Sequence, residues 1–131
     1  MTVNKTQMMA VIEAWLRRNV PSKELGWPEI GEKFTRWTLL HTPWFRIYLH
    51  KLNCLQDPVV CHDHPWHFWT VILRLGYFER IGSVVTYRRP GNVLYRPARH
   101  LHSVWTVGDA WSLLLVSPRV RQWRNHVACR D

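Results

Sequence analysis

The chain has 131 residues, close to the commonest size of one folded domain, and 47% of them are apolar. We therefore expect a single hydrophobic core and exclude wholesale disorder. Its net charge of +9 comes from 14 Arg and 4 Lys against nine acidic residues, which favours anionic partners such as small acids or nucleic acid. The nine tryptophans must fill a core, line a pocket or form an interface, and composition does not choose among these.

The sequence carries no sign of a membrane or secretory segment. No apolar run approaches the roughly 18 residues that a spanning helix needs, and the charged N-terminal stretch lacks the cleavage site of a signal peptide. Three cysteines, Cys54, Cys61 and Cys129, cannot all pair within one chain, so no disulfide scaffold is indicated. We expect a reducing, cytoplasmic compartment.

An amphipathic helix is predicted over residues 6–18, because its apolar residues recur at spacings of three and four. Pro21 ends it, and a second short helical turn is predicted near 28–33. We expect residues 1–33 to form a helical extension that packs on the following domain as a lid, and residues 34–131 to form that domain.

From about Phe34 onwards, short runs rich in Trp, Val, Ile, Tyr and Thr alternate with turn residues every eight to twelve positions. This texture is typical of an all-β sandwich or barrel. The segment 62–75 is too long for one straight strand, so we expect a bend near Pro65. The predicted strands are 36–40, 45–52, 62–75, 77–80, 84–88, 93–96, 102–107, 111–116 and 121–126.

Eight histidines are present, and His62 and His64 flank Asp63 at the head of a strand-like run. Residues i and i+2 of a strand project to the same face, so the two rings can share one ion. His102, at the start of another predicted strand, is the best candidate for a third ligand. Three imidazoles on neighbouring strands can bind one metal and leave positions open for water or substrate.

Three segments resemble the motifs of a known family. The His-Asp-His-Pro-Trp box at 62–66, followed by the turn at 75–79, is similar to the first cupin motif, and 91–102 is similar to the second. With the segment 117–123, the match is closest to small single-domain cupins (RmlC-like jelly rolls) of uncharacterised function in bacteria and tailed phages. The resemblance spans about residues 45–126 and implies an all-β double-stranded β-helix (jelly-roll) barrel behind an N-terminal α-helix.

The chain departs from the general cupin pattern at two places. A metal-binding glutamate usually follows the second histidine by four or five residues, but Phe68 and Trp69 stand there. Arg99 replaces a usual glycine after the proline of the second motif. The resemblance therefore implies a three-histidine site, which is also similar to that of thiol dioxygenases. It would hold one divalent transition metal, and Fe, Zn, Ni, Mn and Cu all suit imidazole ligands.

Several further residues are candidates for the site. Glu79 would act as acid or base, or form an ion pair with Arg74, Arg80 or Arg88, and the basic excess favours the ion pair. Tyr95 would face the interior by strand parity and donate its hydroxyl near substrate, or fill the core. Candidate substrate contacts are Trp69, Arg96 and Arg99, because the two arginines flank Pro97 at the expected barrel mouth and could clamp an anion.

Other polar residues near the motif have alternative roles. His67 and His100 are open as extra ligands or as rim residues. Asp63 and Cys61 should point away from the pair, Cys61 as a packing residue.

Three functions fit these observations. The first is a metal-dependent enzyme, dioxygenase-like or a Lewis-acid isomerase or hydrolase, acting on a small anionic substrate. The second is a non-catalytic cupin that binds or senses a small molecule, for example in phage–host conflict. The third and least favoured is nucleic-acid binding through the basic surface. A homodimer is expected as well, since small cupins often dimerise and the tryptophans must be buried somewhere.

Overall fold

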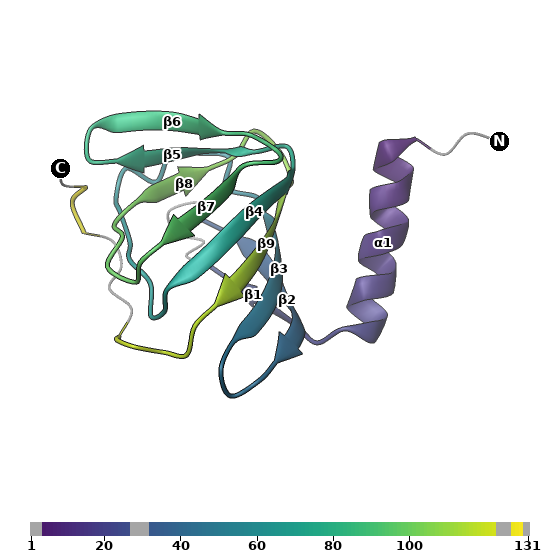
Figure 1. The fold of residues 1–131 in the computed structure, drawn as a ribbon. Coiled ribbons are helices and arrows are strands. Elements are labelled where there is room, and N and C mark those ends of the chain that lie inside the picture. The colour runs from purple at the N-terminus through teal and green to yellow at the C-terminus, as the bar shows by residue number, and fades with distance from the viewer. Residues whose placement is uncertain (1–3, 27–31, 123–126, 130–131) are drawn as a thin grey trace.

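A computed structural model describes residues 4–26, 32–122 and 127–129. One helix, α1 (Lys5–Asn19), precedes two antiparallel sheets that face each other (Figure 1). The six-stranded sheet has the order β1 (Ser22–Leu25), β2 (Phe34–His41), β3 (Arg46–Leu52), β9 (Ala110–Val116), β4 (Phe68–Arg74) and β7 (Val93–Arg96). The three-stranded sheet has the order β6 (Val84–Arg88), β5 (Tyr77–Ile81) and β8 (Ser103–Trp105). The all-β fold class with an N-terminal helix is therefore confirmed.

The predicted helix extends by one residue at each end. Asn4 caps it: its side chain accepts from the backbone N–H of Gln7, and the Gln7 side chain accepts from the backbone N–H of Asn4. The helix that the structure describes is not long and apolar enough to cross a membrane.

The strand predictions differ from the structure at both ends of the chain. β1 was not expected, yet it pairs with β2 from Ser22 opposite Trp37 to Leu25 opposite Phe34, so the first sheet begins within the stretch assigned to the helical extension. The predicted strand at 121–126 does not form at residues 121–122, and its residues 123–126 lie outside the described part of the chain. The turn predicted near 28–33 also falls largely outside it.

The long run at 62–75 bends as expected. A continuous strand begins only at Phe68, while His62 forms an isolated bridge and residues 63–67 turn through Pro65. The Pro65 carbonyl accepts a hydrogen bond from the backbone N–H of Val120 at 2.7 Å. The proline thus sets where the histidine box ends and the sheet begins.

Strand alternation divides the first sheet into an inner and an outer face. The inner face contributes the largest apolar cluster, formed by Tyr48, Trp66, Phe68, Leu114 and Val116. This cluster lies between the two sheets.

The outer face carries Trp37 stacked on Trp111, with ring centroids 5.5 Å apart. Leu16 of α1 packs against this tryptophan pair, and Glu13 pairs with Lys51 at 2.7 Å. The helix is therefore anchored to the outside of the barrel, and none of its described residues lines the cavity discussed below.

A disulfide joins Cys61 to Cys129, which are 68 positions apart in sequence. No disulfide was expected, and that prediction is wrong in the structure. The cause is a backbone bridge between Cys61 and Val127, which brings the C-terminal segment beside the histidine box and could not be read from cysteine spacing. Cys54 stays unpaired and buried.

Candidate metal centre

The histidine box lies alongside the segment that follows β7. His62 and His102 exchange two backbone hydrogen bonds, of 2.8 and 3.0 Å, and the backbone N–H of His64 donates to the Ala98 carbonyl at 3.0 Å. Two residues that exchange both bonds of an antiparallel pair project to the same face. The pairing therefore turns the rings of His62 and His102 towards the same space, and alternation brings His64 there too.

The three rings meet at one end of the space between the sheets. One ring nitrogen from each of His62, His64 and His102 lies within 4.8 Å of the others, and the ring centroids are 4.8 to 5.2 Å apart. His64 and His102 are buried, and the His62 side chain is 12% exposed. The structure thus brings together all three residues predicted as metal ligands.

Glu79, fully buried on β5, fixes the orientation of His102. Its Oε2 lies 2.6 Å from Nδ1 of His102 and 3.1 Å from Nε2 of His100. Its Oε1 accepts from Nε of Arg88 at 2.8 Å and from a terminal amino group of Arg96 at 2.6 Å. Burial opposes ionisation of Glu79, but these hydrogen bonds hold its pKa far below the usual range.

An ionised carboxylate only accepts hydrogen bonds, so Nδ1 of His102 carries the proton and its Nε2 keeps a free lone pair. This is the arrangement in which a carboxylate orients a metal-binding histidine. Of the two roles considered for Glu79, the structure contains the ion pairs, and its arginine partners are Arg88 and Arg96 rather than Arg74 or Arg80.

His64 and His102 lie in surroundings that favour neutral imidazole. Burial lowers the pKa of His64 well below its ordinary value, helped by the neighbouring His102 and His62, and burial also lowers the pKa of His102. Nδ1 of His64 is buried and has no hydrogen-bond partner among the residues that the structure describes. Neutral rings with a buried nitrogen left without a partner fit a metal, because the metal ligand is the neutral imidazole.

Glu32 approaches the cluster from the segment before β2, and sequence reasoning missed it. One of its carboxylate oxygens lies 3.7 Å from Nδ1 of His62, and burial raises the pKa of Glu32 to about 7. Glu32 belongs to no recognisable motif, and its distance in sequence from the histidine box does not indicate that it contacts His62. Only the fold brings it near.

Glu79, His100 and His102 form a second group with donor atoms within 4.8 Å of one another. Here the carboxylate already has two arginine partners, and His102 presents its protonated nitrogen. These contacts make the group a hydrogen-bond network behind the three-histidine cluster rather than a second metal site.

The remaining residues of the box point elsewhere. Asp63 is fully buried and pairs with Arg121 at 2.8 Å, which ties the C-terminal segment to the box. Nδ1 of His67 accepts from the backbone N–H of Ala98 at 2.9 Å, and His67 lines a shallow pocket on the outer side of the sheet. Cys61 points away from the cluster, as expected, but into the disulfide.

Trp69 and Tyr95, expected at the site, lie on the outer face of the sheet. They sit opposite each other in the β4–β7 register, with ring centroids 5.1 Å apart and exposures of 50% and 45%. The interior position predicted for Tyr95 is therefore wrong, and Trp69, a candidate substrate contact, does not line the cavity. Strand alternation cannot be counted from His102 back to Tyr95, because residues 97–101 form a turn instead of continuing the strand.

Arg96 and Arg99 do not form the expected clamp. Arg96 binds Glu79, and Arg99 is exposed at the surface. Neither lines the internal cavity. Strand parity sends Arg96 towards the network of Glu79, while Arg99 belongs to the turn.

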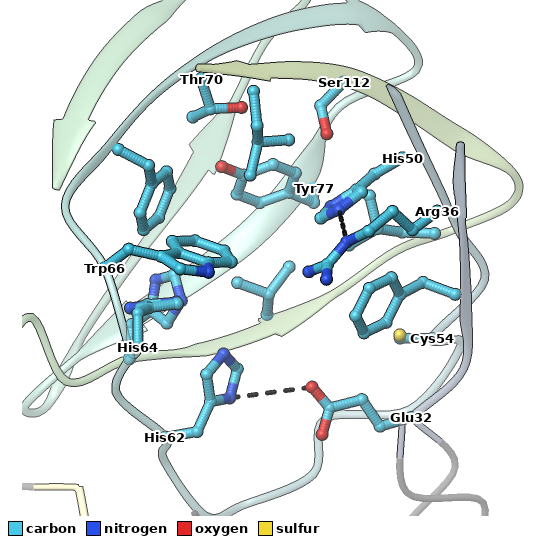
Figure 2. A pocket seen from close by; sticks show the side chains of 16 residues that line it. Glu32, Arg36, His50, Cys54, His62, His64, Trp66, Thr70, Tyr77 and Ser112 are labelled. Atoms are coloured by element: carbon cyan, nitrogen blue, oxygen red, sulfur yellow. Dashed lines mark hydrogen bonds and ion pairs between the residues drawn. The ribbon is translucent and has the colours of Figure 1, made fainter. Parts of the chain in front are cut away.

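The three histidines line an internal cavity of about 80 Å³. Figure 2 shows Glu32, His62 and His64 at one end of the cavity, and Arg36 reaching in from β2 beside His50. Nε of Arg36 donates to Nε2 of His50 at 3.1 Å. Burial, with a contribution from Arg36, lowers the pKa of His50 well below its ordinary value, so the ring is neutral and accepts this bond.

No family model matches the sequence, and no curated protein matches it either. Solved structures do resemble the fold. The polyketide cyclase RemF from Streptomyces resistomycificus aligns with a TM-score of 0.65 at 21% identity, covering 83% of this chain and 81% of RemF. A cupin-2 domain protein from Rhodospirillum rubrum aligns at 0.64 and 13% identity, covering 80% and 74% of the two chains.

A third structure, FeII HppE, aligns at 0.60 and 11% identity, covering 76% of this chain and 57% of its own. At these identities the likeness concerns the fold alone. The fold is the cupin double-stranded β-helix, as the resemblance implied.

Proposed function

We propose that this chain is a metal-dependent cupin enzyme, with one divalent transition metal on His62, His64 and His102, acting on a small anionic substrate. The observation that carries the proposal is the cluster of three ring nitrogens within 4.8 Å, one of them oriented by the buried Glu79. The Fe(II) named for the structurally similar HppE adds support from a protein of the same fold.

The residues around the cluster suit this role. Glu79 holds a proton on Nδ1 of His102 and thereby leaves Nε2 free to bind. The rings of Trp66 and Phe68 lie against His64, which limits access of water to that side. A bound metal would supply Lewis acidity or, if redox-active, the capacity to activate O₂. The imidazole set is compatible with Fe, Zn, Ni, Mn and Cu, and does not select among them.

The test is the metal content of the purified chain, followed by titration of chelator-treated protein with Fe²⁺, Mn²⁺, Ni²⁺, Cu²⁺ and Zn²⁺. We expect binding of one metal ion per chain, lost in His64→Ala and His102→Ala. His41→Ala is the matched control, because His41 is an exposed histidine far from the cluster in sequence. Equal binding by the His64→Ala and control variants, both shown to be folded by circular dichroism, would contradict the proposal.

A catalytic role and a purely binding role make different predictions. An enzyme loaded with iron should consume O₂ or transform small carboxylates in a screen. A sensing module, for example one acting between phage and host, should hold metal and retain a cellular molecule through purification without turnover. The internal position of the three histidines is common to both.

Nucleic-acid binding has less support than either. Several arginines that contribute to the net charge are engaged inside the molecule, because Arg88 and Arg96 bind Glu79 and Arg36 points into the cavity. Binding of DNA or RNA at low salt, falling steeply as salt rises, would revive this alternative.

A cytoplasmic location is part of the proposal and has one observation against it. Disulfides persist mainly in oxidising compartments, and Cys61 is joined to Cys129. Trapping thiols with iodoacetamide during cell lysis decides the matter, since a cytoplasmic protein should be alkylated at both residues.

Homodimerisation also stays a prediction. Trp37, Trp66 and Trp111 are buried within the chain, whereas Trp44 and Trp69 remain exposed. Light scattering coupled to size-exclusion chromatography would measure the mass in solution.

A further inference from the structure

Arg36 is a cation inside the barrel, and no described residue forms an ion pair with it. Its neighbours in the described chain include no carboxylate within ion-pair distance, whereas the arginines around Glu79 and Asp63 all have one. Glu32 lines the same cavity, but its carboxylate lies 3.7 Å from Nδ1 of His62, and no contact joins it to Arg36 among the described residues. Burial lowers the pKa of Arg36, as expected of a charge removed from water without an opposite charge nearby.

The contacts of Arg36 hold its guanidinium in one orientation. Its Nε is bound to His50, and its planar group lies over the Tyr48 ring at 4.2 Å. These contacts occupy one edge and one face of the group. The two terminal amino groups donate to none of the described residues and point into the cavity (Figure 2).

The free edge of Arg36 faces the space that the metal cluster also borders. Its guanidinium lies 5.7 Å from the Trp66 ring, and that ring is stacked on His64 with centroids 5.9 Å apart. A single indole ring therefore separates the cation from a candidate metal ligand. Thr70 and Ser112 also line the cavity and bring hydroxyl groups to it.

Retaining a cation in such a place has a free-energy cost. Removing a charge from water is unfavourable unless an opposite charge and hydrogen bonds compensate. Stacking on tyrosine compensates in part, but no described residue accepts a hydrogen bond from the two terminal amino groups. A ligand anion would satisfy both, because a guanidinium and a carboxylate form two parallel hydrogen bonds.

We propose that Arg36 binds the carboxylate of a short-chain monocarboxylic acid whose other end faces His62, His64 and His102. The inference rests on the proposed function for the role of the histidines, and it defines the substrate class of that same site. It also replaces the clamp of Arg96 and Arg99, which the structure places outside the cavity.

The cavity limits the size of the acid. Its volume of about 80 Å³ is well below the ~150 Å³ that admits benzene in an engineered protein cavity. Acids of about two to four carbons are the expected occupants. A single guanidinium balances one negative charge, which favours a carboxylate over a phosphate dianion.

The test is calorimetric titration of the full chain with acetate, propionate and pyruvate, with propionamide as the neutral isostere of propionate and inorganic phosphate as the competing anion. We expect the acids to bind, propionamide to bind at least tenfold more weakly, and Arg36→Gln to weaken the acids by at least tenfold. Arg99→Gln is the matched control, because it removes the same charge from an exposed position.

The inference would be overturned by no binding of any of the acids, by equal binding of propionate and propionamide, or by loss in Arg99→Gln but not in Arg36→Gln. Preference for phosphate would also contradict it. Should Arg36→Gln fail to fold, the comparison of propionate with propionamide on the unmodified chain, together with Arg36→Lys, decides the question.

Running each titration before and after chelator treatment separates the two proposals. Acid binding that survives chelation in a protein without metal affinity would retain the role of Arg36 and reject the metal site. Metal binding without acid binding would do the reverse.

Discussion

His62 and His102 are 40 positions apart in sequence, yet each donates its backbone N–H to the carbonyl of the other. The direct pairing means that the relative position of the two rings, with centroids 4.8 Å apart, is set by main-chain hydrogen bonds rather than by side-chain packing. A site defined in this way should tolerate substitutions of neighbouring side chains better than shifts of the chain.

Glu79→Gln should weaken metal binding without abolishing it. Glutamine keeps the shape of the side chain but loses the charge that holds the proton of His102 on Nδ1, and loss of such a partner typically lowers metal affinity by about 10–100-fold. Competition with a chromophoric chelator measures this change. The absorption spectrum of the Co²⁺-loaded protein should shift as well, which a purely structural role for Glu79 would not cause.

Glu24→Gln is the control for this change, since Glu24 also pairs with an arginine but does so at the surface. Its metal affinity should equal that of the unmodified chain. An unchanged affinity in Glu79→Gln, measured where both variants are folded, would contradict the positioning role.

Replacement of Cys61 and Cys129 by serine should lower the free energy of unfolding by about 3 kcal/mol. A cross-link spanning 68 positions restricts the unfolded chain, and the loop-closure model gives values of this size or somewhat larger. Urea unfolding of the oxidised chain and of the double variant measures the difference. Dithiothreitol should destabilise the oxidised chain and leave the double variant unaffected.

The thiol of Cys54 should resist alkylation in the folded protein. Burial raises its pKa from 9.0 to about 11, so at pH 8 the reactive thiolate is about a hundredfold scarcer than for an ordinary cysteine. Raising the pH towards 11 should accelerate the reaction. Mass spectrometry after iodoacetamide treatment follows it, and fast labelling of the native chain at pH 8, as in urea, would contradict the prediction.

Leu16→Ala should destabilise the protein by about 2 kcal/mol, because Leu16 is the buried contact of α1 with the tryptophan pair on the outer sheet face. Val11→Ala on the same helix is the matched control, since Val11 is exposed and should cost little. Thermal unfolding of both variants checks the helix docking. Similar losses in the two would contradict docking through Leu16, because alanine is the strongest helix former and helix propensity would not cause a loss in either variant.

Trp69→Ala and Tyr95→Phe should leave metal stoichiometry and acid binding unchanged. Both side chains lie on the outer face of β4 and β7, away from the cavity. The metal and acid titrations described above provide the measurement. A tenfold loss in either variant would contradict this prediction and return the residue to the site.

Much of the fold could be predicted because its determinants are local. Spacing of apolar residues located α1, and turn residues separated most of the strands. β1 was missed because Ser22–Leu25 is short, largely exposed and polar, so nothing distinguishes it from a linker until β2 is available as a partner.

In the candidate site too, the residues that local patterns determine could be predicted, and the others could not. His62 and His64 follow from strand alternation, and His102 from its place after the second motif. Arg36 and Glu32 carry no motif, and they become relevant only when two sheets close around them. The sequence did contain one signal for Arg36. It lies two positions after Phe34 in β2, so strand alternation puts this charged residue on the same inward face as the phenylalanine.

The link between Cys61 and Cys129 makes the chain from one to the other a covalent ring. All three histidines and Glu79 lie within that ring, whereas Arg36 belongs to the open segment that precedes it. A single proteolytic nick anywhere in the ring would leave the histidines on pieces that stay tethered until a reductant is added. A nick between β2 and Cys61 would instead detach the arginine, with the strand that carries it, from the ring, so that only non-covalent contacts would hold the two parts of the cavity together.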